Sequence, residues 1–388
     1  MKSEWEYRRL GELVSFSSGG TPSKKRTDYW NGDIPWISAK TLKSEKITTS
    51  DLFITTSGLS SGSKIAPKGS ILLLTRGSGL FNDLPIGMVE SEVAFNQDIK
   101  CLNSYGEIEN EFVFYWLQSQ KKYLMAKVDV TGIGAGKFDL DFLQELQVPF
   151  PDKKVREKII AIATAISEKI EANKKINDNL EQQTAALFSS LYNRSNTEVR
   201  YTDLIQILGG GTPKTGEPAY WNGNIAFFTP KDVGAPYTFI TEKTITEEGL
   251  SHCNSRLYPV NTVFVTARGT VGKVGLSGVP MAMNQSCYAL VGKETHQLLV
   301  YFYTLKAVDR LKHKASGAVF DAITTRDFDS EQIMKLSDDD AKAFLCVAEP
   351  MFQEILNNSI ENLRLSTLRD FLLPKLMTGE IDVSSVQL

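Results

Sequence analysis

Two long stretches of the chain carry matching residues at alternating steps of four and three positions. In the first stretch these positions are Ile159, Ala163, Ile166, Ile170, Asn173, Asn177, Leu180, Thr184, Leu187 and Leu191. In the second they are Phe344, Ala348, Met351, Ile355, Asn358, Asn362, Leu365, Arg369, Leu372 and Leu376. A repeat of about 3.5 residues places such positions on one face of a helix and is typical of a coiled-coil seam. The pattern therefore predicts two long helices with matching seams.

Both seams carry asparagine at the same two central positions. A buried asparagine at a seam position lowers stability but selects the register and the partner. In an antiparallel pair, Asn173 would face Asn362 and Asn177 would face Asn358. We therefore expect the two helices to pair with each other and these asparagines to hold their register. Two amphipathic helices docked separately on their own domains would explain the apolar stripes, but not the matched asparagines.

The starts of both helices carry capping signals. Asp152 can cap the first helix, and Ser337 with Asp340 resembles a capping box at the start of the second. Pro350 removes a backbone donor inside the second helix, so we expect a kink or a later start near it.

Outside the helices, short apolar runs bounded by glycine and proline predict strands, as in Ile71–Thr75 and Thr262–Thr266. These strands indicate globular parts of mixed α/β or α+β class. Their order in a sheet cannot be deduced from the sequence.

Short sequence blocks recur in the same order in the two halves of the chain, which is the pattern of a duplicated domain. The recurring blocks are Gly19–Pro22 with Gly210–Pro213, Tyr29–Gly32 with Tyr220–Gly223, Gly58–Ser60 with Gly249–Ser251, Arg76-Gly77 with Arg268-Gly269, and Asn96-Gln97 with Asn284-Gln285. The spacing between partners changes by only a few residues, and such small insertions belong in loops. Two copies of one domain indicate two similar tasks.

Composition places the chain among ordinary globular proteins. It has 388 residues, room for two to three domains, with 42% hydrophobic and 23% charged residues. No apolar run reaches the length of about 18 residues that a membrane span needs, and the first ten residues are too polar for a signal peptide. The four cysteines lack metal-ligand spacing. We therefore expect a cytoplasmic protein with free thiols and no zinc.

The net charge of −3 argues against a uniformly basic nucleic-acid binder, but charge is sorted along the chain. Residues 1–76 carry a net charge of +5, whereas residues 77–150 carry −6. Only a local basic face could therefore contact phosphate, and an ordinary solvated surface explains the same asymmetry.

Motifs for catalysis are missing from the sequence. The Asn/Asp-Pro-Pro-aromatic motif with which amino-methyltransferases orient an exocyclic amine does not occur. The segment Gly132–Phe138 resembles a phosphate-binding loop, but it lacks the first glycine at the required distance and the Ser/Thr that would hold magnesium. We expect this segment to be a flexible loop. The three histidines share no motif with a serine or cysteine nucleophile. We therefore expect no catalysis, no cofactor and no metal in this chain.

What the two copies share is a set of candidate binding residues. A Gly-Gly-Thr-Pro turn leads into a loop with cations, which suits phosphate contact but equally describes an exposed turn. An arginine ends an apolar strand in each copy, where it could reach DNA or pair with a carboxylate. The Asn-Gln pairs could read adenine or serve as internal hydrogen-bonding residues, and the Tyr-Trp pairs more simply frame a strand. The candidate DNA-binding residues are Thr21, Lys24, Lys25, Arg26, Lys40, Arg76, Thr212, Lys214, Lys231, Arg268 and Lys273.

The order of these blocks, each set followed by a proline-flanked strand and a long helix, resembles the specificity subunit of type I restriction–modification enzymes. The run Leu372–Glu380 is similar to that family's characteristic ending of the distal helix. The resemblance covers essentially the whole chain. One departure is Val155–Lys158, where the family usually has a glutamine near the start of the central helix.

The resemblance implies two target-recognition domains, each reading one half of a bipartite asymmetric site in double-stranded DNA. It also implies that the two helical regions act as a spacer and as the docking surface for two modification subunits. Those partners bind S-adenosylmethionine and methylate adenine, while restriction subunits supply the ATP- and Mg-dependent motor and the nuclease. The chain itself would be non-catalytic and would not contact a membrane.

We therefore predict an α+β fold in which two duplicated target-recognition domains are joined by two long antiparallel coiled-coil helices with pseudo-two-fold symmetry. The predicted domains are residues 1–150, the central helical region 151–195, residues 196–336 and the distal helical region 337–388. At about 1.5 Å per residue, a helix from Ile159 to Leu191 is about 50 Å long, enough to hold two domains about one DNA turn apart. The alternatives are a self-contained DNA methyltransferase and a tandem-domain scaffold that does not bind DNA.

Overall fold

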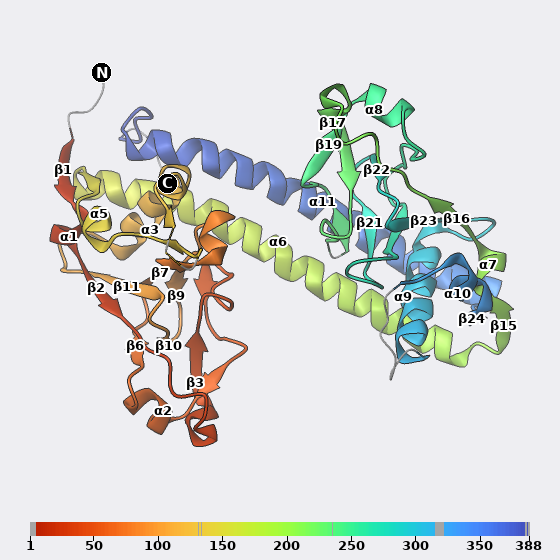
Figure 1. Cartoon of the computed structure of the whole chain (residues 1–388), viewed down its shortest axis with the longest axis horizontal. Helices are drawn as coiled ribbons and strands as arrows, with labels where there is room; N and C mark the ends of the chain where they lie inside the picture. The colour runs from red at the N-terminus through yellow and green to blue at the C-terminus, as the bar shows by residue number, and fades with distance from the viewer. Residues whose placement is uncertain are drawn as a thin grey trace. The chain divides into compact units, whose positions relative to one another are not determined.

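The computed structural model of the chain (Figure 1) describes residues 5–384 apart from 131, 133, 235 and 315–321, together with residue 386. The chain divides into two compact units. The first comprises Met1–Ile170 and Arg364–Leu388, and the second comprises Glu171–Leu363. Each unit combines one globular domain with parts of both long helices. This division cuts across the four sequence segments proposed above, whose boundaries stay a prediction.

The first globular domain is built on two main sheets. The larger has the strand order β2-β11-β7-β9-β4, and the smaller has the order β5-β3-β10-β6. Strand β7 is buried at all four positions, as its continuous apolar run predicts. The bounds in the larger sheet are β2 Val14–Ser18, β4 Lys46–Ile47, β7 Ile71–Leu74, β9 Ile86–Val89 and β11 Ile99–Ser104. Those in the smaller sheet are β3 Trp30–Ile37, β5 Phe53–Ile54, β6 Lys64–Ala66 and β10 Val93–Phe95.

The second globular domain repeats this topology. Its larger sheet has the order β16-β23-β20-β21-β18, strand for strand the counterpart of the first, and its smaller sheet has the order β19-β17-β22. The bounds are β16 Ile205–Gly209, β17 Trp221–Phe228, β18 Tyr237–Thr238, β19 Lys243–Ile245, β20 Val263–Thr266, β21 Val274–Ser277, β22 Met281–Met283 and β23 Cys287–Gly292. The duplication predicted from five sequence blocks is therefore a duplication of the fold.

Smaller elements complete both domains in matching places. A two-stranded sheet joins the first strand of each domain to the strand before the long helix: β1 Glu6–Arg9 with β14 Gln147–Phe150, and β15 Thr197–Arg200 with β24 Gln332–Lys335. The helices are α1 Leu10–Leu13, α2 Thr56–Ser60, α3 Asn110–Ser119, α4 Lys121–Met125 and α5 Leu140–Gln144 in the first domain, and α7 Tyr201–Leu204, α8 Glu247–Ser251, α9 Gln297–Lys314 and α10 Thr325–Ser330 in the second.

The two long helices are α6 (Lys153–Arg194) and α11 (Asp338–Met377). Every predicted seam position of both helices is buried or half-buried. The side chain of Ser337 accepts a hydrogen bond from the Asp340 N–H (3.1 Å) and its hydroxyl donates to the Asp340 carboxylate (2.9 Å). The predicted start of α11 is therefore confirmed.

Of the two alternatives expected near Pro350, a kink or a later helix start, the later start is wrong. Helix α11 begins at Asp338 and runs through Pro350 without a break. A proline inside a helix costs about 3 kcal/mol. The fully buried seam residues Phe344 and Ala348, which precede it, bury enough apolar surface to hold the first turns in the helix.

Within the second unit, the helices are antiparallel in the register that the sequence predicts. Asn173 Nδ2 donates to Asn362 Oδ1 at 2.9 Å, and Asn358 Nδ2 donates to Asn177 Oδ1 at 3.0 Å. Further hydrogen bonds join Asn173 to Glu361 (2.7 Å) and Asn177 to the main chain of α11. The expected pairing is found. That these residues set the register stays a prediction.

Helix α6 is anchored to the first domain at its start, where the family's usual glutamine is missing. Arg156 is 5% exposed and pairs with Glu109, the N-cap residue of α3, at 2.6 Å. The same guanidinium donates to the carbonyls of Pro151 (2.7 Å) and Glu107 (3.3 Å), and it lies over the ring of Phe150. Where the family usually has a glutamine, this chain therefore carries an ion pair between the buried Arg156 and the half-buried Glu109, within the first unit.

Candidate nucleic-acid interface

In the first domain, the Gly-Gly-Thr-Pro turn lies against the Asn-Gln pair that follows β10. Gly20 N–H donates to the Phe95 carbonyl at 3.0 Å, and Thr21 Oγ1 donates to Gln97 Oε1 at 2.7 Å. A Cβ at Gly19 would overlap the Phe95 carbonyl, so only glycine allows this approach. The glycines thus bring two chain segments together, and the Gly20 amide is already used.

Two exposed cations flank this contact. The backbone N–H groups of Thr75 and Arg76 both donate to the Asp98 carbonyl, at 2.9 and 3.2 Å, so Arg76 stands beside Gln97. The amide of Asn96 donates to the Ile37 carbonyl (2.9 Å), just before the turn that carries Lys40. We call the exposed residues Thr21, Lys40, Arg76 and Gln97 the first shared cluster.

The second domain builds the same arrangement. The Gly211 N–H donates to the Met283 carbonyl (3.1 Å), and Thr212 donates its hydroxyl to Gln285 Oε1. Arg268 N–H donates to the Ser286 carbonyl at 3.2 Å. The second shared cluster is Thr212, Lys231, Arg268 and Gln285. Blocks far apart in the sequence therefore form one surface in each domain.

The two members of each Asn-Gln pair have different roles. Asn96 is buried, and its side chain accepts from the Asp98 N–H (3.2 Å) and donates to the Asp98 carboxylate (3.0 Å). Asn284 likewise accepts from the Ser286 N–H at 3.0 Å. Of the two alternatives above, the asparagines therefore take the internal one. The glutamines Gln97 and Gln285 are exposed.

The Tyr-Trp pairs frame a strand, as expected. Trp30 packs edge-to-face on Trp36, with ring centroids 5.2 Å apart, and its Nε1 donates to the Ser23 carbonyl at 3.2 Å. Trp221 repeats this arrangement on Phe227 at 5.5 Å. The indole N–H of each tryptophan thus fastens the cation-bearing loop to the strand.

The loop cations are not equivalent. Lys24, Lys25 and Lys214 are exposed, and no ion pair to them is formed within the described residues. Arg26, in contrast, pairs with Asp28 at 2.7 Å and lies over the Tyr29 ring at 4.7 Å. The hydrogen bonds that Arg26 donates to the Asp28 carboxylate raise the pKa of Arg26. Arg26 is thus engaged within its own loop. In the second shared cluster, Lys231 has an exposed partner, since its Nζ lies 3.4 Å from Glu242.

The segment Gly132–Phe138, expected to be a flexible loop, is partly a strand. Strands β12 (Asp129–Val130) and β13 (Gly136–Lys137) form a hairpin, and β13 pairs with β8 (Arg76–Gly77). In that pairing Lys137 stands directly opposite Arg76. The expectation is wrong for Gly136–Lys137, because this strand is stabilised by a partner some 60 residues away, which local sequence does not show.

Lys137 is therefore a candidate residue that sequence reasoning missed. Directly opposed residues of an antiparallel pair lie on the same face, and like charges there repel. Both Arg76 and Lys137 are exposed, and neither has a carboxylate partner among the described residues. Two opposed cations of this kind suit a bound anion such as phosphate. The only signal in the sequence was the basic residue at the end of the glycine-rich segment.

The second domain differs at this point. Arg268 is bridged to Ala322, so no second cation stands opposite it. A further exposed cation of this domain is Lys273, whose main chain is hydrogen-bonded to Thr266, two residues before Arg268. The cations beside the shared clusters thus differ between the two domains.

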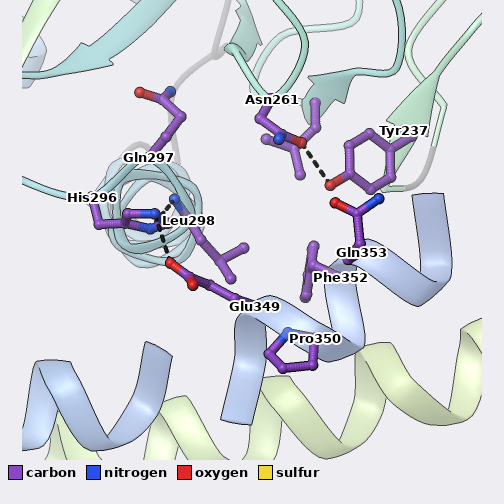
Figure 2. A pocket seen from close by; sticks show the side chains of 10 residues that line it. Tyr237, Asn261, His296, Gln297, Leu298, Glu349, Pro350, Phe352 and Gln353 are labelled. Carbon is purple, nitrogen blue, oxygen red and sulfur yellow. Dashed lines mark hydrogen bonds and ion pairs between the residues drawn. The ribbon is translucent and has the colours of Figure 1, made fainter. Parts of the chain in front are cut away.

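A pocket of about 510 Å³ lies elsewhere in the second unit (Figure 2). His296 and Glu349 point toward each other across one side of it and lie 2.8 Å apart, and Tyr237 donates its hydroxyl to Asn261 at 2.8 Å. These polar groups satisfy one another. The pocket shares no residue with the second shared cluster.

Within the described residues, no group of His, Cys, Asp and Glu side chains could hold a metal ion. None of the described helices combines the length and apolar character needed to cross a bilayer.

Comparison with known proteins gives the class. The family model of the type I restriction modification DNA specificity domain matches residues 2–182 and again residues 193–335. The chain therefore belongs to this family and carries two such domains. It is a DNA specificity subunit of the type I restriction–modification class.

Curated relatives agree with this assignment, and a solved structure shares the fold. The chain is 23% identical to the type I restriction enzyme MjaIX specificity subunit of Methanocaldococcus jannaschii, over 99% of this chain and 95% of that protein. It is 29% identical to the EcoR124I/EcoR124II specificity subunit of Escherichia coli over 42% of this chain and 40% of that one. The crystal structure of the type I restriction-modification S subunit from M. genitalium shares the fold, with a TM-score of 0.59 at 16% identity over 96% of both chains. The predicted fold class is thereby confirmed.

Proposed function

We propose that this chain is a non-catalytic subunit that reads a bipartite DNA site, one half with each globular domain, through the face that carries the shared cluster. The observation that carries the proposal is the duplication of that cluster. In each domain, three segments separated in sequence converge to bring a threonine together with an exposed glutamine and an exposed arginine. The threonine is exposed in the first domain (Thr21) and half-buried in the second (Thr212).

The chemistry of this surface fits duplex DNA better than a small substrate. Exposed Arg and Lys side chains bind phosphate oxygens, and amide side chains donate to phosphates or base edges. The candidate cations stand on turns and strand ends, where a groove-shaped partner can reach them. Nothing in the clusters offers a nucleophile or a general base.

The proposal includes the partners and cofactors of the complex. Two modification subunits would dock on the helical regions, and restriction subunits would join that assembly. S-adenosylmethionine, ATP and Mg would be bound by those subunits. The matched halves of the fold support a partner of the same kind for each half.

The test is to co-express the chain with its modification partner and to sequence methylated adenines in the host DNA. We expect one bipartite motif. Exchanging residues 1–150 for those of a relative should change one half of the motif and leave the other intact. Loss of both halves in an assembled hybrid would show that the domains do not read independently.

Two measurements on the purified chain separate the proposal from its rivals. Titration calorimetry with S-adenosylmethionine should show no binding, and stoichiometric binding would favour a self-contained methyltransferase. Affinity for duplex DNA should fall steeply as salt rises, because phosphate contacts release counterions. A scaffold that does not bind DNA would show no such dependence.

A further inference from the structure

We propose that Thr21 and Thr212 are positioning residues that orient the amides of Gln97 and Gln285 so that each glutamine donates from Nε2 to a DNA phosphate. This inference rests on the proposed function. It adds a contact in which an uncharged amide donates to a DNA phosphate, and this contact is common to both half-sites.

The hydrogen bond within each pair fixes the direction of the glutamine amide. The threonine hydroxyl donates to the glutamine Oε1 in both domains, at 2.7 Å in the first. An amide held by its oxygen presents its NH₂ group on the other side. In the part of the chain that the structure describes, neither Gln97 Nε2 nor Gln285 Nε2 has a hydrogen-bond partner, and both side chains are exposed. Each domain thus displays two oriented N–H donors.

The backbone holds the pair in place on both sides. Thr21 follows the amide of Gly20, which is bonded to the Phe95 carbonyl two residues before Gln97. Asn96, between them, is buried and bonded to Asp98. The glutamine therefore starts from a rigid position, so little conformational entropy is lost when it donates to a ligand.

The identity of the pair in both domains selects phosphate over a base. The two halves of an asymmetric site differ in sequence, but both have the same sugar–phosphate backbone. A contact built identically in both domains therefore matches what the half-sites share, since phosphate contacts position a protein without reading sequence. Bidentate reading of adenine would also need Oε1 as an acceptor, and the threonine already uses one of the two lone pairs of that atom.

The neighbouring cations support the same assignment. The backbone N–H groups of Arg76 and Arg268 donate to the carbonyls of the residues that follow the glutamines. These residues are Asp98 and Ser286. Opposite Arg76 stands Lys137, with no carboxylate partner in the described chain. A phosphate at the Gln97 amide would lie close to both positive charges, which would strengthen the bond from Nε2.

The experiment uses the complex of the full chain with its modification partner, after the wild-type motif has been mapped by sequencing of methylated adenines. Fluorescence anisotropy then measures affinity for a duplex with the mapped motif and for duplexes with one base of a half-site replaced. The variants are Gln97→Met and Gln285→Met, which remove the donor at similar length. Gln206→Met, an exposed glutamine on β16 outside the cluster, is the matched control.

For Gln97→Met we expect affinity to fall about tenfold on every duplex by the same factor, with the methylated motif unchanged, because one hydrogen bond to a charged acceptor is lost. In Thr21→Val, DNA affinity should fall about threefold, because the amide of Gln97 can then rotate. Thr21→Ser keeps the hydroxyl and should bind DNA with wild-type affinity. The control should bind like the wild type. Unchanged melting temperatures show that the variants are folded.

Two results would overturn the inference. A methylated motif that loses selectivity at one base position in Gln97→Met would identify a base contact. Wild-type affinity in both glutamine variants would assign the pair a structural role only. If the wild-type complex itself showed no salt-dependent duplex binding, the proposed function would fail first, and that outcome is distinct from either of these.

Discussion

Removing the guanidinium of Arg156 should destabilise the first unit more than any surface substitution. Arg156 is 5% exposed, and its partner Glu109 has a side chain that is 25% exposed. Breaking a fully buried ion pair from one side costs about 3–5 kcal/mol, because a charge stays buried without its partner. Since Glu109 keeps some contact with water, we expect Arg156→Ala to cost about 2–3 kcal/mol.

Urea unfolding followed by tryptophan fluorescence measures this cost. Four of the five tryptophans lie in residues 1–150, so the signal reports mainly on the first unit. With a urea dependence of about 2 kcal/mol per M, the expected cost lowers the midpoint by about 1 M or more. Arg156→Lys should lose about half as much, since lysine keeps the charge but cannot donate to Glu109, Pro151 and Glu107 at once.

The pH dependence of this cost distinguishes two contributions of Arg156: its charge, and its packing on the ring of Phe150. Burial disfavours the ionised form of Glu109 and is the largest single effect on its pKa. The hydrogen bond from Arg156, a main-chain hydrogen bond and the charges of Arg156 and Lys153 together outweigh burial and hold the pKa of Glu109 below its ordinary value. A lowered folded-state pKa adds stability above the unfolded value of about 4.3, and this stability is lost as pH falls through the folded value. The cost of Arg156→Ala should thus be constant from pH 7 to about 5 and shrink below about 4. An equal cost at pH 3 would refute the ion-pair argument.

Three further predictions follow from buried contacts. Replacing Asn173, Asn177, Asn358 and Asn362 together by Leu should stabilise the second unit by about 1 kcal/mol in guanidinium unfolding, because both members of each hydrogen-bonded pair become apolar and the Oδ1 of Asn173, buried without a hydrogen-bond partner in the described chain, is removed; a loss of more than about 1 kcal/mol would contradict this. Gly19→Ala should lower both the melting temperature and DNA affinity, whereas Gly79→Ala, which has open space for a Cβ, should lower neither. Burial raises the pKa of the Cys287 thiol to about 12, so at pH 8 iodoacetamide should modify the exposed Cys346 and spare Cys287, as peptide mass spectrometry would show.

The features that the sequence predicted correctly are those that depend on spacing along the chain. The seam of α6 and α11 follows from a 3.5-residue period, and the pairing of Asn173 with Asn362 follows from that period and an antiparallel direction. The duplication follows from repeated blocks. In each case, residues a fixed number of positions apart were compared, and no knowledge of the tertiary fold was needed.

The features that the sequence did not show depend on strand pairing between distant segments. Lys137 stands opposite Arg76 only because β13 pairs with β8, and Thr21 meets Gln97 only because the turn after β2 lies on the end of β10. Local propensity also suggested a later start of α11 near Pro350. The helix nevertheless begins at Asp338, because tertiary burial outweighs the backbone N–H donor that proline lacks. The candidate residues were therefore largely identified one by one, while their grouping into one surface required the fold.

The structure also indicates how two copies of one domain can read different sequences. Each arginine of the shared clusters is held by the same backbone bonds, yet the segments that follow diverge at once. In the first domain, a 3₁₀ helix (Ser78–Phe81) exposes Phe81, whereas in the second a short loop leads directly to Lys273. A change in either segment leaves the strand end that carries the arginine in place, because that end is fixed by the bond to Asp98 or Ser286. On the proposed function, the shared cluster would hold each domain on the DNA backbone, and the adjoining segments could vary without loss of that hold.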